Sequence, residues 1–320
     1  MHCIGVDVSK QELVTFDGTT GRVFANTPGL AAFRRFVGSE ADVVIVFEPT
    51  STYSRRLETF CRTQKIACCQ LNPRVVPHYR QVGKGRSKTD KTDAELLYRY
   101  GIERGQEEAG QLTNDALAQA VVARLACHRV IQKARVAYHG LLDALEHDPA
   151  TEKGLLSGLR REVADLKLRE TRQLAEAQAV VAADADAAKR LDVLLSIPGI
   201  GPITAVTLLA LFRKYPGVNR QQLVALGGLD PIQVQSGTSV HGKSRISKRG
   251  NREVRRCLFE ATLSAARFNP GIRAIYRRLK DEGKPDKVAR IAAARKLLLS
   301  QTEEELRSNS RAARARAAIY

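Results

Sequence analysis

Four acidic side chains near the start of the chain have the types and the spacing of a metal site. Asp7 lies at the end of an apolar stretch, and Glu48 directly follows the most apolar stretch, residues 43–47. Asp90 and Asp93 are three residues apart, a spacing that puts both carboxylates on one face of a helix. Carboxylate oxygens suit Mg²⁺, and two such ions can act together on a phosphate ester. We therefore expect these acids to hold Mg²⁺, as two ions.

Each acid taken alone has a simpler explanation as a helix cap or a surface charge. Thr89 can itself cap a helix that begins beside it. The set is more specific than its members, because a charge at Asp7 inside an apolar strand needs a compensating interaction. No His or Cys lies at metal-binding spacing near these acids, and the six cysteines contain no C-x-x-C pair, so zinc is not expected.

The elements that must position these acids alternate between strands and helices. The order is three strands, a helix, a strand, a helix, a strand and a further helix, which favours an α/β domain with a mixed sheet. Ligands of such sheets gather at the carboxyl ends of strands, where Asp7 and Glu48 lie. We expect strands over residues 3–8, 13–16, 22–25, 43–47 and 66–71, and helices over residues 30–37, 53–64 and 92–104.

The same residues carry a family resemblance. Residues 4–10 (IGVDVSK), 48–50 (EPT), 72–73 (NP) and 88–94 (KTDKTDA) resemble the N-terminal domain of the IS-one-ten family of insertion-sequence transposases, the DEDD transposases. That domain is similar to the RuvC Holliday-junction resolvase and has the ribonuclease-H fold. The resemblance implies that the metal-binding, catalytic acids are Asp7, Glu48, Asp90 and Asp93. The expected order of strands fits that fold independently.

Residues 112–183 are predicted to form a long helical pair, broken near Asp148 and Pro149. Glycine is sparse there, and apolar residues recur at every third or fourth position. Two interpretations stay open for this pair: an intramolecular helical hairpin, or a coiled-coil arm that joins two copies of the chain.

Residues 193–212 are uncharged over 20 positions, which is long enough to cross a bilayer. Pro198 and Pro202, with glycines between them, break this run, so we expect two short helices and no membrane span. Such a helix-hairpin-helix can offer backbone N–H groups to a phosphate. The alternative is a packing hairpin without a ligand.

The chain is strongly basic, with a formal net charge of +18 and a pI near 9.9. Residues 237–320 hold 21 Lys and Arg against 8 Asp and Glu, which is the distribution expected of nucleic-acid binding. A flexible basic loop without a ligand is the alternative. A helix beginning near Asn251 would align Arg252, Arg255 and Arg256 on one face. The residues expected to contact nucleic acid are Lys84, Arg86, Lys88, Lys91, Lys243, Arg245, Lys248, Arg249, Arg252, Arg255 and Arg256.

The resemblance continues towards the C-terminus. Residues 198–202 (PGIGP), 228–231 (GLDP), 235–237 (QSG) and 246–251 (ISKRGN) resemble the C-terminal transposase domain of the same family. The resemblance implies a nucleophilic serine, which the motif assigns to Ser236. The second choice is Ser239, followed by Ser244 and Ser247. The family resemblance also implies a covalent serine–DNA intermediate, donor and target DNA as substrates, and a structured noncoding guide RNA. A homo-oligomer, dimer or tetramer, would bring the serine of one subunit to the acids of another.

The expected fold class is α/β plus all-α. It comprises a RuvC-like mixed-sheet domain (1–108), a helical coiled-coil linker (109–188), a helical C-terminal serine transposase domain (189–300) and a basic tail (301–320). The predicted function is a DNA transposase or recombinase. A hydrolytic, metal-dependent, structure-specific DNA endonuclease is one alternative, and a non-catalytic nucleic-acid binder is another. No secretory signal is visible, so we expect a cytoplasmic, nucleoid-associated protein without a membrane partner.

Overall fold

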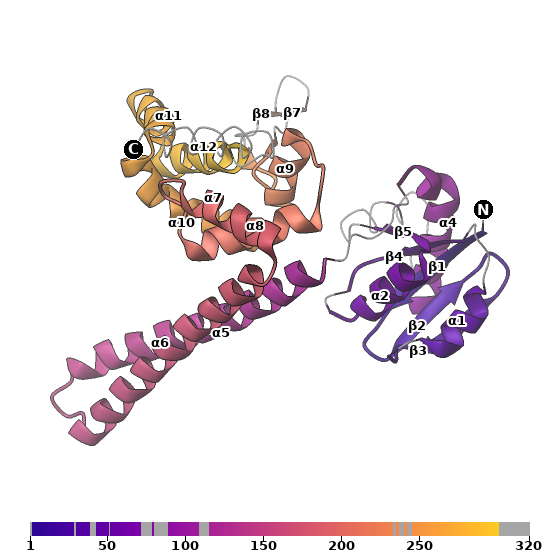
Figure 1. Ribbon diagram of the computed structural model, residues 1–320, viewed down its shortest axis with the longest axis horizontal. Helices are drawn as coiled ribbons and strands as arrows, with labels where there is room; N and C mark the ends of the chain where they lie inside the picture. The colour runs from indigo at the N-terminus through magenta and orange to yellow at the C-terminus, as the bar shows by residue number, and fades with distance from the viewer. Residues whose placement is uncertain are drawn as a thin grey trace. The chain divides into compact units, whose positions relative to one another are not determined.

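The chain forms two compact units, Met1–Asn114 and Asp115–Tyr320. A computed structural model describes residues 2–28, 30–38, 43–50, 52–71, 79, 89–108, 115–232, 235–236, 240–241 and 245–300, shown in Figure 1. For residues 106–108, 235–236 and 240–241 it describes the backbone alone. Each unit has its own hydrophobic core, and each is considered separately below.

The first unit contains the mixed sheet that the sequence predicts. Three neighbouring strands are antiparallel, β1 to β2 and β2 to β3, whereas β1, β4 and β5 run parallel. The order across the sheet is β3-β2-β1-β4-β5. The strands are β1 (His2–Val8), β2 (Glu12–Phe16), β3 (Gly21–Ala25), β4 (Val43–Phe47) and β5 (Ala67–Gln70).

Helices cover both faces of this sheet. Helices α1 (Ala31–Val37) and α2 (Arg55–Gln64) supply Phe33 and Leu57 to one core, where they pack with Ile4 and Val6 of β1. Helix α4 (Asp90–Glu108) covers the other face, where its Leu97 packs with Cys3 and Val46. All residues of β4 are buried because the sheet is covered on both sides, which explains the continuous apolar run in its sequence.

The second unit begins with two long helices that pack side by side (Figure 1). Helix α5 (Ala116–Glu146) and helix α6 (Lys153–Ala182) form the hairpin that the apolar spacing predicts, with its turn at the expected Asp148–Pro149 break. Arg135 of α5 pairs with Glu170 of α6 at 2.6 Å, and the same carboxylate lies 3.6 Å from the buried ring of His128. The two helices therefore form a hairpin within one chain, and an arm that joins two copies of the chain stays a prediction.

Among its described residues, this unit also contains six shorter helices and four two-residue strands. The helices are α7 (Ala185–Leu195), α8 (Pro202–Lys214), α9 (Arg220–Gly227), α10 (Arg252–Phe268), α11 (Pro270–Asp281) and α12 (Asp286–Leu299). The strands pair antiparallel, β6 (Pro231–Ile232) with β9 (Arg245–Ile246) and β7 (Gln235–Ser236) with β8 (Val240–His241).

The base of the hairpin belongs to the core of the shorter helices. Val121 of α5 and Val181 of α6 are fully buried in one cluster with Leu208 of α8 and Leu258 of α10. The boundary between the two units, at residues 114 and 115, lies close to the expected one at 108 and 109. The expected boundary at 188 and 189 falls within this common core, so a separate linker and C-terminal domain stay a prediction.

The long uncharged run is divided as expected. Helix α7 ends at Leu195 and helix α8 begins at Pro202, so the turn between them interrupts residues 193–212. Across the described part of the chain, every helix falls short of the length and apolar character that a membrane span requires.

Candidate active site

The parallel pairing of β1 with β4 brings two of the predicted acids together. Val6 is registered with Phe47, and the next residue of each strand is Asp7 and Glu48. Asp7, within the last residues of β1, and Glu48, directly after β4, therefore both lie at the carboxyl ends of adjacent parallel strands, as the sequence predicts. Both side chains are half-buried. Because side chains alternate along a strand, Asp7 shares the face of Cys3 and Gly5, which is the face that α4 covers.

Two glycines allow α4 to lie directly on β1. A Cβ atom at Gly5 would lie 2.2 Å from the Ala94 carbonyl oxygen and 2.4 Å from the Tyr98 nitrogen. A Cβ atom at Gly101 would lie 2.2 Å from Cys3 Sγ. Gly101, towards the C-terminal end of α4, thus lies over Cys3 at the start of β1, whereas Ala94, nearer the N-terminal end of α4, lies over Gly5 in the middle of β1. The helix runs antiparallel to β1, and its first turn lies towards Asp7.

The first turn of α4 carries the other two acids. The Thr92 N–H donates to Thr89 Oγ1 at 3.2 Å, so Thr89 caps this helix as expected. The Asp93 N–H donates to the Thr89 carbonyl at 2.9 Å. Asp90 and Asp93 are therefore held in one helical turn, with Asp90 exposed and Asp93 half-buried. The positive end of the helix dipole partly offsets the repulsion between them.

The electrostatics of Asp7 connect all four acids. The pKa of Asp7 is raised from 3.8 to about 6, chiefly by burial and then by the charges of Asp90, Asp93 and Glu48, in that order. A hydrogen bond from the Val8 backbone acts in the opposite direction. The fold therefore brings four carboxylates from three elements within electrostatic range, which produces a site of strong negative potential.

This set of oxygen donors fits Mg²⁺ in its chemistry. The distances between the side chains, however, are longer than a bound ion requires. Among the described residues, no group of three or more His, Cys, Asp or Glu side chains lies close enough together to hold a metal ion. The two-ion site stays a prediction.

The predicted nucleophile lies in the second unit. Ser236 is in β7, where it is registered with Val240 of β8. Ser239 and Ser244 lie outside the described residues. Ser247 is described, and its hydroxyl donates a short hydrogen bond to the Asp230 carboxylate. Its backbone N–H donates to the Asp230 carbonyl at 2.8 Å.

The GLDP and ISKRGN motifs interlock through their backbones. The Lys248 N–H donates to the Gly228 carbonyl at 3.1 Å, and the Asn251 N–H donates to the Leu226 carbonyl at 2.6 Å. A Cβ atom at Gly250 would lie 2.2 Å from that same Leu226 oxygen, so only glycine fits there. Residues 245–252, the basic segment, are consequently fixed to the C-terminal end of α9. Spacing in the sequence gave no sign of this contact.

The expected nucleic-acid contacts divide into two groups. Arg255 donates to the Gly227 carbonyl at 3.0 Å, and Arg256 pairs with Glu253 and Glu260. These two side chains therefore have internal partners, although α10 begins after Asn251 as predicted. The exposed residues of the set are Lys91, Arg245, Lys248, Arg249 and Arg252. Those outside the described residues are Lys84, Arg86, Lys88 and Lys243.

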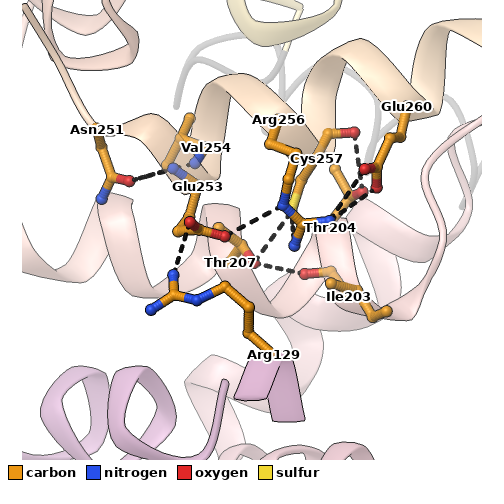
Figure 2. A network of polar contacts seen from close by, with 10 residues as sticks. All are labelled: Arg129, Ile203, Thr204, Thr207, Asn251, Glu253, Val254, Arg256, Cys257 and Glu260. Carbon is orange, nitrogen blue, oxygen red and sulfur yellow. Dashed lines mark hydrogen bonds and ion pairs between the residues drawn. The ribbon is translucent and has the colours of Figure 1, made fainter. Parts of the chain in front are cut away.

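Figure 2 shows a polar network that the sequence gave no reason to expect. Arg129 of α5 pairs with Glu253 of α10 at 2.6 Å, and Glu253 also accepts from Arg256 at 3.2 Å. Asn251 caps the same turn by accepting from the Glu253 and Val254 N–H groups. The network joins the helical hairpin to the turn of α10 that follows the basic segment.

Comparisons with known proteins agree with this arrangement. Residues 4–145 match a DEDD transposase family model, described as "Transposase", and residues 191–277 match the model described as "Transposase IS116/IS110/IS902 family". The "Pilin gene-inverting protein" of Moraxella bovis is 26% identical over 259 residues, which are 79% of this chain and 77% of that protein.

A second relative comes from an insertion element. The "Insertion element IS110 uncharacterized 43.6 kDa protein" of Streptomyces coelicolor is 29% identical over 213 residues, which are 62% of this chain and 48% of that protein. The two family models match different parts of the chain, one containing the four acids and the other containing Ser236. From these matches and relatives together, the chain belongs to the IS116/IS110/IS902 family of transposases.

Proposed function

We propose that this chain is a DNA recombinase that cuts and rejoins strands through a Ser236–DNA ester, and that Asp7, Glu48, Asp90 and Asp93 hold Mg²⁺ ions for this reaction. The observation that carries the proposal is geometric: Asp7 and Glu48 lie at the carboxyl ends of adjacent parallel strands, and the first turn of α4, which carries Asp90 and Asp93, lies towards Asp7. The strand order β3-β2-β1-β4-β5 and the family together support a RuvC-like, ribonuclease-H fold for the first unit.

The chemistry of a serine explains why a recombinase would use one. Ser236 Oγ attacks the phosphorus, the bond to the DNA 3′ oxygen breaks, and the serine proton ends on the released 3′-hydroxyl. Mg²⁺ held by Asp7, Glu48, Asp90 and Asp93 would neutralise the phosphate charge and favour the alkoxide form of the hydroxyl. The serine ester conserves the energy of the broken bond. A 3′-hydroxyl of another strand then attacks that ester, which reseals the DNA and frees Ser236 without ATP.

The acids and the serine belong to different units, so a composite site is part of the proposal. We assign Ser236 of one subunit to the acids of another, in a homodimer or homotetramer. Exposed apolar side chains on the α5–α6 hairpin support this assignment, because such residues are commonly buried at a protein contact. The most exposed of them are Val130, Val136 and Leu168, at 65%, 59% and 69%.

Target choice is assigned to a structured noncoding RNA that pairs with donor and target DNA. The chain has no Trp and only 5% aromatic residues, so side chains offer little for reading bases. The exposed Lys248, Arg249 and Arg252 suit contact with a sugar–phosphate backbone, which carries no sequence information by itself. A protein that delegates base reading to RNA needs this kind of surface.

The test is a denaturing gel for a covalent protein–DNA species, with end-labelled donor DNA, guide RNA and Mg²⁺. The wild type should form the adduct, and Ser236→Ala should lose it and lower strand transfer by about 10³-fold or more. Ser239→Ala and Ser247→Ala are the matched controls and should retain the adduct. Chelation with EDTA should abolish both products.

The same gel distinguishes the alternatives. If the chain is a hydrolytic endonuclease, the Ser236→Ala variant should still cleave DNA, and neither the wild type nor any variant should form the adduct. A non-catalytic binder would be indicated if Asp7→Asn and Asp90→Asn left every product unchanged. An adduct that persists in Ser236→Ala would refute the assignment of the nucleophile.

A further inference from the structure

The corner between α10 and α11 exposes an aromatic ring. Phe268 is the last residue of α10, and 69% of its surface is exposed, more than that of any other aromatic residue that the structure describes. An exposed phenylalanine gains nothing from burial in its own core. A single exposed apolar residue is ordinary, so its surroundings decide whether this ring has a partner.

The surroundings of this ring are positively charged. Residues 261–280 contain five Lys and Arg and no Asp or Glu. Arg267 precedes the ring and is exposed. The Arg273 guanidinium donates to the Arg267 carbonyl at 3.4 Å, so it lies beside the peptide that leads into Phe268. That contact also covers part of the negative end of α10.

Two helix N-termini meet at the same corner. Helix α11 begins at Pro270, directly after Phe268 and Asn269. The turn before α8 packs against this end of α10: Asn269 donates to the Pro198 carbonyl at 3.4 Å, and a Cβ atom at Gly199 would lie 2.5 Å from Ala265 Cβ. Neither helix has an acidic residue in its first turn. Both ends therefore add positive potential.

We propose that this corner binds an unpaired nucleotide of a nucleic-acid strand, with its base stacked on Phe268 and the adjoining phosphates contacted by Arg267 and Arg273. The proposal rests on the assigned DNA recombination, and it adds a contact surface distinct from the four acids, Ser236 and the basic segment 245–252. An unpaired nucleotide fits best because bases inside a duplex already stack on one another and hide their faces. An apolar protein partner would leave the arginines beside it without acids.

The test is anisotropy titration of the full-length chain, without divalent metal, using labelled oligonucleotides of one sequence as single-stranded DNA, single-stranded RNA and duplex DNA. Phe268→Ala should weaken single-strand binding roughly tenfold to hundredfold and change duplex binding little. Phe268→Tyr, which keeps the ring, should retain affinity. A preference for the DNA or the RNA strand identifies the source of the nucleotide, and either preference supports the proposal.

Salt dependence separates stacking from charge. Phe268→Ala should leave the slope of log affinity against log salt unchanged, whereas Arg267→Gln should make it shallower by about 0.7, as for one lost phosphate contact on a single strand. Leu263→Ala is the matched control, because Leu263 is 60% exposed on the same helix, and it should change nothing.

Three results would overturn the proposal: full affinity in Phe268→Ala, full affinity in Phe268→Leu, or loss of self-association in Phe268→Ala by light scattering. The last two would indicate apolar docking rather than stacking. Binding without metal requires neither the acids nor Ser236. A failed adduct assay therefore leaves this result intact, and a failure here leaves the catalytic proposal intact.

Discussion

The ionised side chain of Asp7 destabilises the unit in which it lies. It interrupts an otherwise apolar strand, and burial together with three neighbouring carboxylates raises its pKa to about 6. A group whose pKa is raised on folding binds its proton more tightly in the folded state. Its charged form therefore destabilises the fold, and this effect grows as the pH rises through 6. Such conflict between stability and local charge is typical of functional sites.

Asp7→Asn should therefore stabilise the metal-free protein at pH 8. The gain should be on the order of 1 kcal/mol, because solvent screens a half-buried group. At pH 4 the gain should nearly vanish, since Asp7 is then protonated in the folded protein. Urea unfolding in EDTA at both pH values measures this difference. Mg²⁺ should raise the stability of the wild type but not of Asp7→Asn.

Asp17 provides a control of opposite sign. Although burial raises the pKa of this carboxyl, hydrogen bonds from the Thr20 and Thr19 N–H groups outweigh burial and lower its pKa overall. Asp17→Asn should therefore destabilise the protein near neutral pH and should leave the response to Mg²⁺ unchanged. Equal effects of the two substitutions would show that Asp7 does not experience the other three acids.

At the scale of elements, the position of α4 decides whether the acids meet. The helix contacts β1 through Gly5 and Gly101, where side chains would collide with its backbone and with Cys3. Neither glycine is needed for a turn, and both lie within regular elements. Their role is close approach, which carries the first turn of α4 to the end of β1.

Gly5→Ala should separate helix and strand without touching any carboxylate. We expect a loss of about 2 kcal/mol or more in the free energy of unfolding, together with weaker Mn²⁺ binding in a calorimetric titration. Gly105→Ala on the same helix is the control, since its Cβ would lie at an ordinary 3.8 Å from Val44. Unchanged metal binding in Gly5→Ala would contradict the dependence of the site on this contact.

Regular elements were predictable from the sequence where their pattern is long or uniform. The apolar run of β4, the hairpin α5–α6 and the Asn251 cap of α10 all follow from spacing and residue type. The two-residue strands β6–β9 are too short to show any periodicity.

Contacts at the candidate site were predictable only in part. The four acids were recognisable only as a set, because a charge at Asp7 inside an apolar strand needs a compensating interaction, whereas an acid at a strand end or a helix start is ordinary by itself. The partners of Arg255 and Ser247 were not, because a backbone carbonyl at Gly227 leaves no trace in composition and Asp230 is distant in sequence. Whether Ser236 meets the acids depends on how separate units assemble, which spacing along one chain does not encode.

At the scale of the whole molecule, stability is divided between the two units, with a hydrophobic cluster on each face of the sheet in the first and one cluster in the second. The hairpin α5–α6 contributes Ala118, Val121, Ala177 and Val181 to the core of the C-terminal helices. Arg213 of α8 adds ion pairs to Asp115 at 2.6 Å and to Asp184 at 3.3 Å, the caps of α5 and α7. The hairpin and the C-terminal helices should therefore unfold together.

Fragments of the chain test this division. Residues 115–320 expressed alone should melt cooperatively, by circular dichroism, because their core is complete. Residues 189–320 should lack a cooperative transition, since they lose the buried side chains of α5 and α6. If the shorter fragment proved as stable as the longer one, a separate linker over residues 109–188 would be the correct division.

The length of the hairpin has a geometric consequence. Helix α5 has 31 residues, so the rod is about 45 Å long, which matches about 13 base pairs of B-form duplex. The base of the rod is packed against the C-terminal helices, and the part beyond Arg129, which pairs with Glu253 of α10, extends about 25 Å to the tip. The hairpin can thus act as a ruler: seven extra residues in each helix would move the tip by about 10 Å while preserving the packing phase.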